Sequence, residues 1–467
     1  MLWCTFRTKD HFYIYDRQEN RIGELSKEDF EVLNSRSDKQ LLEATSKKLQ
    51  LYGFCRDNML TEIENPASEH IDYYLHNQMT QLVLQVTQQC NLRCSYCVYS
   101  GKYNNRTHTN KNMTLETAKK AVDFLITNSK DSKKVYVGFY GGEPLLRFEL
   151  IRDVVKYIET EYPGKNVGYS MTTNATLLSS DIMDFVVSKD FNLLISLDGP
   201  ESIQNKNRCF ASGEGSYKTV IDNLKQFKEK YPDYYSRCAL SMTLSQETDF
   251  GCIDNFISTD DVIDSIAARI GFLSDVGLDS LAPYDEKVYA IQEELKMKQL
   301  LSYMGEIPER MEHNLFGSYA TSLLPKQYVL DTGIMTIKKG HPGGPCIVGV
   351  KKAFVDVNGD IFPCEKIAES DELKIGNIYK GFYIDKVLKL INIAKTTEKE
   401  CKDCWAFAFC AACVAASINH SGISAEKRLS KCKTIRRSSL ISLRELKIME
   451  EYGYDAKRFF SAEVRNE

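Results

Sequence analysis

Three cysteines on one short loop constrain this chain more than any other feature. Cys90, Cys94 and Cys97 lie in the run Thr-Gln-Gln-Cys-Asn-Leu-Arg-Cys-Ser-Tyr-Cys, a C-x₃-C-x₂-C spacing. Three thiolates this close in sequence can hold three irons of a [4Fe–4S] cluster, whereas a cluster that only transfers electrons is normally held by four cysteines. The spacing therefore predicts one iron that has no protein ligand and is open to another molecule.

Composition and charge indicate which partners and which cysteine chemistry to expect. The 467 residues include 60 Lys+Arg and 64 Asp+Glu, a balance that gives no reason to expect a nucleic-acid or anionic-membrane partner. The N-terminus lacks a signal-peptide pattern, and no apolar run reaches the eighteen or so residues of a membrane span, so we expect a cytoplasmic protein. Fifteen cysteines in such a chain point to metal binding rather than to disulfides.

Strands and helices alternate from residue 81 to about 275. Repeated βα units with apolar strands predict an α/β fold, a parallel sheet covered by helices, in which function lies at the carboxyl ends of the strands. The expected strands are 82–86, 135–140, 167–172, 191–197 and 239–244, and the expected helices are 114–127, 150–160, 180–187 and 217–230.

Polar and glycine-rich motifs follow these strands. Two glycines in a row let the backbone approach a ligand closely, and short polar side chains at strand ends suit ribose hydroxyls. Taken singly, each motif is as readily an ordinary turn or helix cap. The candidate residues at these strand ends are Gly141, Gly142, Glu143, Pro144, Asn174, Ser196 and Asp198.

The cysteine loop and the Gly141–Pro144 motif together resemble the radical S-adenosylmethionine (SAM) enzymes. The resemblance implies a partial (β/α)6 TIM-like barrel over residues 80–300, with the amino and carboxylate groups of SAM on the open iron. It implies that a reduced cluster cleaves SAM to a 5′-deoxyadenosyl radical, which abstracts a hydrogen from carbon. The implied contacts are the Gly141–Pro144 backbone to the amino group, Arg208 to the carboxylate, Asn174 and Ser196 to the ribose, Asp198 to the ribose or the substrate, and Tyr96 to the adenine.

Seven further cysteines lie in a C-terminal region, residues 341–440. Asn358-Gly359 predicts a hairpin that brings the first two of them together. The region resembles the SPASM domain, which holds two auxiliary [4Fe–4S] clusters and would give three clusters in all. Two residues separate the last pair of the tight group, where the family usually has three. The seven are Cys346, Cys364, Cys401, Cys404, Cys410, Cys413 and Cys432.

Seven thiols are one too few for two fully ligated clusters. The SPASM resemblance implies that Cys401, Cys404, Cys410 and Cys432 hold a distal cluster. Cys346, Cys364 and Cys413 would hold a proximal one, whose open iron takes a substrate cysteine thiolate. The alternative is a pair of structural zinc sites. Seven cysteines do not divide into two such sites, and His341 and His420 are poorly spaced to complete them.

Residues 1–75 are expected to hold a small separate module, over residues 1 to about 60, and the start of a polar linker, over residues 61–80. Strand patterns followed by helices give a winged-helix-like outline, but ten basic and ten acidic residues in the first 60 argue against DNA. The outline resembles the RiPP recognition element, to which a leader peptide adds a strand. The remaining expected segments are a bridging region, 301–340, and a helical tail, 441–467.

Taken together, the resemblances imply a maturase that forms thioether crosslinks, of ranthipeptide or sactipeptide type, in a ribosomally made precursor peptide. Its other partner would be a reducing electron donor such as flavodoxin or ferredoxin. Two alternatives remain open: an anaerobic sulfatase-maturing enzyme that oxidises Cys or Ser to formylglycine, and a non-catalytic zinc-bound peptide scaffold.

Overall fold

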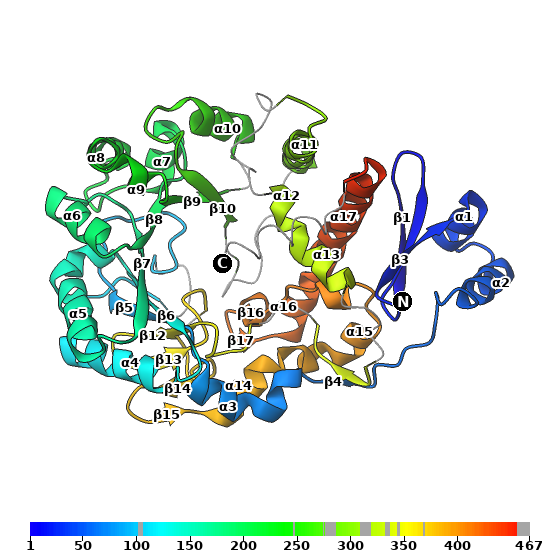
Figure 1. Cartoon of the computed structure of the whole chain (residues 1–467), viewed down its shortest axis with the longest axis horizontal. Helices are drawn as coiled ribbons and strands as arrows, with labels where there is room; N and C mark the ends of the chain where they lie inside the picture. Colours follow the sequence, from blue (N-terminus) through cyan, green and yellow to red (C-terminus); the bar gives the residue numbers. More distant parts are fainter. Residues whose placement is uncertain are drawn as a thin grey trace.

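A computed structural model describes most of the chain (Figure 1). The residues described are 1–100, 106–245, 248–273, 275, 286–308, 319–331, 337–342, 346–367 and 369–454. The expected helical tail over 441–467 is helical as far as Glu451, and the residues after 454 lie outside the described residues, as do parts of the expected bridging region.

Six parallel strands in chain order form the centre of the fold. Helices between them lie on the outer, convex side of the curved sheet (Figure 1), as the alternating pattern predicts. The strands are β5 (Gln81–Thr87), β6 (Lys134–Gly141), β7 (Asn166–Thr173), β8 (Asn192–Ser196), β9 (Ala239–Leu244) and β10 (Ala267–Phe272). The covering helices are α4 (Leu115–Thr127), α5 (Phe148–Glu161), α6 (Ser180–Ser188), α7 (Glu201–Asn207), α8 (Tyr217–Lys230), α9 (Pro232–Tyr235) and α10 (Phe250–Thr259).

Local sequence explains these elements. The Thr114 hydroxyl accepts from the Thr117 amide at 3.1 Å and so caps α4. In α5, Ile151, Val155 and Ile158 recur at helical spacing and are buried against the sheet. Strand β10, Ala-Ala-Arg-Ile-Gly-Phe, carries no buried residue, which is why no apolar run predicts it.

The C-terminal region continues this sheet. β12 (Ala353–Val355) pairs in parallel with β5 and antiparallel with β13 (Asp360–Phe362). β14 (Gly376–Asn377) and β15 (Gly381–Phe382) complete ten strands. The Asn358-Gly359 hairpin is confirmed, with Gly359 at φ +89°. Cys364, just after β13, is thereby fixed against the same sheet as the cysteine loop after β5.

Residues 61–80 are folded onto the core, so the expectation of a linker is wrong. β4 (Glu62–Ile63) pairs with β11 (Lys339–Gly340), and the 3₁₀ turn η1 (Pro66–His70) leads into α3 (Ile71–Asn77). Ile71 and Leu75, one helical turn apart, are buried in the main core. Two apolar positions in a polar stretch are too few to predict this packing.

The N-terminal module has a three-stranded antiparallel sheet and two helices. β1 (Trp3–Arg7), β2 (Phe12–Asp16) and β3 (Arg21–Leu25) precede α1 (Lys27–Ser35) and α2 (Lys39–Gln50). Ser26 caps α1 through the Asp29 amide at 3.1 Å, as expected. One sheet face packs on these helices through Ile14 and Leu33.

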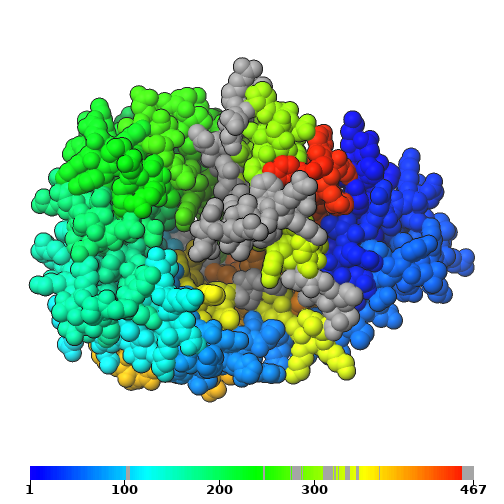
Figure 2. Space-filling view, in the orientation of Figure 1, coloured from blue at the N-terminus to red at the C-terminus, as the bar shows by residue number. Residues whose placement is uncertain are grey.

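The other face of that sheet packs on the C-terminal half of the chain. Phe6, Tyr13 and Tyr15 share a buried cluster with Phe409 and with Leu443, the latter on α17 (Cys432–Glu451). The module and α17 (red) therefore lie side by side at one end of the molecule (Figure 2). The expected separate module has its own core on one face of its sheet, but the other face is buried only through contact with the C-terminal half of the chain.

Smaller elements complete the described structure. These are α11 (Glu286–Tyr303), α12 (Tyr319–Ser322), α13 (Leu324–Asp331), α14 (Ile384–Ile391), α15 (Glu398–Lys402), α16 (Ala425–Ser430), β16 (Ile418–Asn419) and β17 (Gly422–Ile423), with the 3₁₀ turns η2 (Pro144–Arg147), η5 (Ile393–Thr397), η6 (Phe407–Phe409) and η7 (Val414–Ser417). Among the helices described, none has the length and apolar character needed to cross a membrane.

Candidate functional site

The cysteine loop leaves the end of β5 and is held by the segment that follows α7. The Arg93 amide donates to the Cys209 carbonyl at 2.7 Å, and the Ser95 amide donates to the Asn207 carbonyl at 2.9 Å. Within the loop, backbone amides point at two sulfurs: Leu92 N–H at Cys90 Sγ and Tyr99 N–H at Cys97 Sγ, both at 3.4 Å. Amides aimed at sulfur favour a thiolate and so suit a metal ligand.

Burial acts against the thiolate form of these cysteines. It raises the pKa of Cys90 to about 12 and that of Cys94 to about 11, and it also raises the pKa of Cys97. The nearby Arg208 guanidinium acts in the opposite direction on Cys94 and Cys97. Three half-buried thiols that influence one another fit a soft, multiply charged metal centre.

Gly141 and Gly142 bring the end of β6 against the start of the cysteine loop. A Cβ on Gly142 would lie 1.8 Å from the Gln89 carbonyl oxygen, and one on Gly141 would lie 2.1 Å from the Thr87 oxygen. Gly141 also has φ +141°, which favours glycine. The amides of Gly142 and Glu143 donate to those same carbonyls at 2.9 and 2.8 Å. The two glycines therefore allow the backbone of residues 87–89 to approach the end of β6 closely.

Glu143 ties two strand ends together from a fully buried position. Its carboxylate accepts from the Thr173 hydroxyl at 2.7 Å, the Asn174 amide at 2.8 Å and the Leu145 amide at 3.0 Å. Burial raises its pKa, and these donors act against that rise. Pro144 follows as the first residue of η2.

Asn174 joins β7 to the cysteine loop. Its Nδ2 donates to Asn91 Oδ1 at 2.9 Å, and Asn91 in turn donates to the Thr176 hydroxyl at 2.8 Å. Asn91 and Thr176 were not among the predicted residues, because only the fold places them beside Asn174. Ser196, also buried, is the last residue of β8.

Asp198, Arg208 and Tyr96 form one buried group beside the cysteines. Arg208 Nε donates to Asp198 Oδ2 at 3.0 Å, the Tyr96 hydroxyl donates to the same oxygen, and the guanidinium lies 5.4 Å from the Tyr96 ring centroid. The Thr243 amide donates to Asp198 Oδ1 at 2.9 Å. Asp198 therefore orients both predicted partners of SAM, which leaves the terminal Arg208 nitrogens as the atoms suited to a carboxylate.

The seven C-terminal cysteines fall into two groups. Cys401, Cys404, Cys410 and Cys432 line one apolar cavity together with Phe407 and Ile435, and we call them the distal cysteine group. The charge of Cys413 raises the pKa of both Cys346 and Cys364, and these three residues form the proximal cysteine group. Burial raises the pKa of Cys364 to about 11.

Neither group is arranged as a single-ion site. Among the described residues, no three His, Cys, Asp or Glu side chains are placed to share one metal ion. The donors of both groups are sulfurs throughout, which is the ligand type that holds iron–sulfur clusters.

The barrel encloses a cavity that reaches Glu365, the residue after Cys364. A cavity of about 250 Å³ is lined by Tyr140, Thr172, Arg269, Lys352 and Glu365, among others. Lys352 Nζ and Glu365 Oε1 lie 3.1 Å apart, and burial raises the pKa of Tyr140 to about 12. A polar lumen next to Cys364 offers room for part of a substrate.

Comparison with known proteins matches residues 84–251 to the model of the radical SAM superfamily. An uncharacterised protein of Methanocaldococcus jannaschii is 38% identical over 147 residues, which are 32% of this chain and about half (47%) of that protein. A cysteine-type anaerobic sulfatase-maturating enzyme of Clostridium novyi is 23% identical over 71% of this chain and 86% of its own length.

Among solved structures, native anSMEcpe with bound AdoMet and Cp18Cys peptide is similar, with a TM-score of 0.55 and 18% identity. The match covers 78% of this chain and 98% of that one. At this identity the likeness is one of fold.

Proposed function

We propose that this chain, which carries a radical SAM domain over residues 84–251, joins a cysteine sulfur to a carbon atom within a ribosomally made precursor peptide. The observation that carries the proposal is the division of the C-terminal cysteines into a distal group of four and a proximal group of three. Four thiols complete a cluster, and three leave one iron for a soft substrate ligand.

The residues around Cys90, Cys94 and Cys97 would bind SAM. When bound, SAM and the reduced cluster supply the one-electron chemistry that removes a hydrogen atom from carbon. The chain's part is to position the groups: Asp198 orients Arg208 for a carboxylate, and Asn174 and Ser196 lie at neighbouring strand ends. Glu143 holds the ends of β6 and β7 at a fixed separation.

Cys346, Cys364 and Cys413 would hold the proximal cluster. Its fourth iron would supply a site at which a substrate cysteine binds as a thiolate. The polar lumen beside Glu365 would take the neighbouring peptide residues. Sulfur and the carbon to be attacked would then both lie in the space between the cysteine loop and β13.

The N-terminal module would bind the leader of the precursor. β3 is the outer strand of its sheet and pairs with β2 alone among the described strands. An extended peptide could add to that edge through main-chain hydrogen bonds. Both faces of this sheet are already covered, one by α1 and α2 and the other by α17 and Phe409. Addition of a strand to the β3 edge is therefore the way in which this sheet can bind a peptide.

Formylglycine formation is a second candidate, favoured by the long match to the C. novyi sulfatase-maturating enzyme. The two chemistries differ in the fate of sulfur. Thioether formation retains sulfur and removes two hydrogens per bond, whereas formylglycine formation from cysteine removes sulfur.

The test is an anaerobic reaction of the reconstituted enzyme with SAM, a reductant and a leader-bearing, cysteine-rich candidate precursor peptide. We expect a product two hydrogens lighter per bond, and we expect the same peptide without its leader to remain unmodified. A sulfur-free aldehyde product on a leaderless peptide would instead establish the second candidate.

A further inference from the structure

Arg428 is a buried cation that lies between the two C-terminal cysteine groups. Its side chain is 2% exposed. Nε donates to the Thr397 hydroxyl at 3.1 Å, and that hydroxyl lies 3.3 Å from Cys401 Sγ. Nη1 donates to the Ala412 carbonyl at 2.7 Å, between Cys410 and Cys413 in the chain. Arg428 therefore forms hydrogen bonds to residues that lie beside cysteines of both the distal and the proximal group.

Arg17 is a second buried cation, and it comes from the N-terminal module. It is 3% exposed. Nη1 donates to the Lys402 carbonyl at 2.5 Å and lies 3.5 Å from that of Cys404, and Nη2 donates to Asn58 Oδ1 at 2.6 Å. The guanidinium also lies 5.4 Å from the Phe407 ring centroid, and Phe407 lines the cavity of the distal cysteine group.

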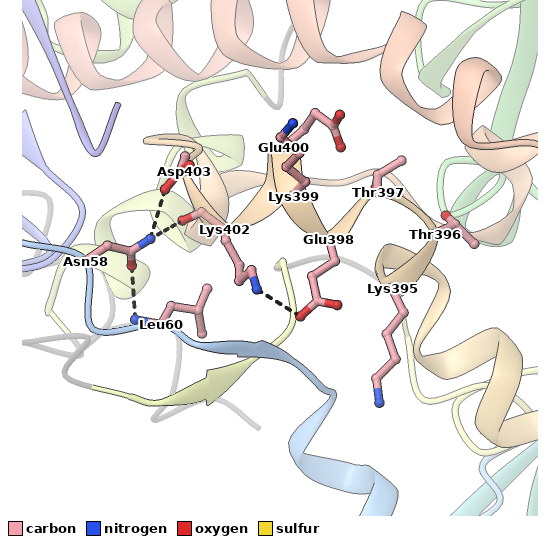
Figure 3. A pocket seen from close by; sticks show the side chains of 10 residues that line it. All are labelled: Asn58, Leu60, Lys395, Thr396, Thr397, Glu398, Lys399, Glu400, Lys402 and Asp403. Carbon is pink, nitrogen blue, oxygen red and sulfur yellow. Dashed lines mark hydrogen bonds and ion pairs between the residues drawn. The ribbon is translucent and has the colours of Figure 1, made fainter.

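Two further residues of the N-terminal region form hydrogen bonds to the segment between Cys401 and Cys404. The Met1 amine donates to the Asp403 carbonyl at 2.6 Å. Asn58 Nδ2 donates to the Lys402 carbonyl at 2.9 Å and to Asp403 Oδ1 at 3.1 Å, as the dashed lines of Figure 3 show. The residues between Cys401 and Cys404 are therefore held by the N-terminal module.

Neither cation has a carboxylate partner within ion-pair distance in the part of the chain that the structure describes. Their acceptors are carbonyl, hydroxyl and amide oxygens. A buried cation without a counter-charge is costly. Four thiolates around a [4Fe–4S] core carry more negative charge than the core carries positive charge, so a loaded distal site would supply the missing anion.

We propose that Arg17 and Arg428 are the buried counter-charges of the cluster held by the distal cysteine group, so that the N-terminal module helps to set the reduction potential of that cluster. This inference rests on the proposed function. Both arginines are positioning residues. Reduction adds a negative charge to the cluster, and a fixed cation close by makes reduction easier.

The test is a redox titration, followed by electron paramagnetic resonance, of the full-length enzyme loaded with iron and sulfide. A Cys90→Ala/Cys94→Ala/Cys97→Ala background leaves only the auxiliary clusters to be observed. Arg17→Gln and Arg428→Gln remove each charge, and Arg17→Lys and Arg428→Lys keep it. Arg7→Gln is the matched control, because it removes an exposed arginine from β1 of the same module.

We expect each glutamine variant to disfavour reduction of one auxiliary cluster at least tenfold, which for one electron lowers its midpoint potential by about 59 mV or more. The lysine variants and Arg7→Gln should stay near the parent value. Loss of about four irons per chain in the glutamine variants, with retention in the lysine variants, would support the same role.

Unchanged potentials in both fully loaded glutamine variants would overturn the inference, as would lysine variants that behave like the glutamine variants. Failure of the proposed function is seen separately and earlier. A wild-type enzyme that binds about twelve irons but forms no crosslinked peptide contradicts the proposed function and leaves this inference standing, whereas one that binds only about four irons has no auxiliary cluster, and then this inference fails.

Discussion

Single residues at the strand ends fix the geometry of the candidate SAM site, and Gly142 is the least replaceable of them. In Gly142→Ala the new methyl would overlap the Gln89 carbonyl, so we expect a loss of about 1–3 kcal/mol in unfolding free energy. The displaced cysteine loop should also bind less iron. Gly164→Ala is the control, since a methyl there meets nothing within 4 Å. Chemical denaturation and iron assay measure both effects, and equal behaviour of the two variants would contradict the close-approach argument.

Asp198 matters because it faces a buried cation. In Asp198→Asn the Arg208 guanidinium loses its counter-charge at a site where Asp198 is fully buried, so we expect destabilisation of about 3–5 kcal/mol. SAM affinity should fall as well, because Arg208 is no longer oriented.

The matched control is Asp190→Asn, which breaks the exposed pair with Arg237 and should cost about 0–1 kcal/mol. Thermal unfolding and equilibrium dialysis with SAM report the two effects. If Asp198→Asn bound SAM as tightly as Asp190→Asn does, the assigned orienting role would be wrong.

At the scale of elements, α17 carries a pH-sensitive contact. Glu445 is buried and its Oε2 accepts from the Tyr319 hydroxyl at 2.7 Å. Burial raises the pKa of Glu445 from 4.5 to about 7. Because the folded state binds this proton more tightly, the stability it contributes is present at pH 4.5 and is lost as pH rises through 7.

We therefore expect wild-type unfolding free energy, measured against Glu445→Gln, to fall by about 2 kcal/mol between pH 5 and pH 8. Urea denaturation of both proteins at several pH values gives this difference. A difference that is flat across the range, or that rises with pH, would show that Glu445 titrates as an ordinary carboxylate.

The proximal cysteine group should be separable from SAM cleavage. We expect Cys413→Ala to form 5′-deoxyadenosine at a rate within about twofold of wild type while crosslink formation falls at least about tenfold. Cys252→Ala, at an exposed cysteine outside both groups, should change neither rate. Chromatography of the nucleoside and mass spectrometry of the peptide measure the two products. Parallel loss of both would mean that Cys413 only supports the fold.

Elements with continuous apolar runs could be predicted from the sequence, and those without could not. The strands from β5 to β9 alternate with amphipathic helices and appear where expected. β10 has no buried residue, and α3 has two buried positions in a polar stretch, so neither stands out locally. The Asp198–Arg208 pair joins two predicted residues, but its geometry depends on α7 folding between them.

For the whole molecule, the most consequential feature is the contact between the N-terminal module and the C-terminal cysteine region. Arg17 and Cys404 are 387 positions apart, and no local pattern predicts that they meet. The sequence predicts a peptide module and a cysteine-rich region, and only the fold shows that one supports the other. Deletion of residues 1–60 would uncover Phe409 and Leu443, so it cannot serve as a clean test of leader binding.

The most direct test of thioether formation is tandem mass spectrometry of the leader-bearing, cysteine-rich precursor after anaerobic reaction with the full-length enzyme, SAM and reductant. We expect each modified peptide to retain all of its sulfur, to have lost two hydrogens per bond, and to fragment as if a cysteine were bridged to another residue. A product that has lost cysteine sulfur, or 5′-deoxyadenosine formed with an unaltered peptide, would contradict thioether formation as the activity.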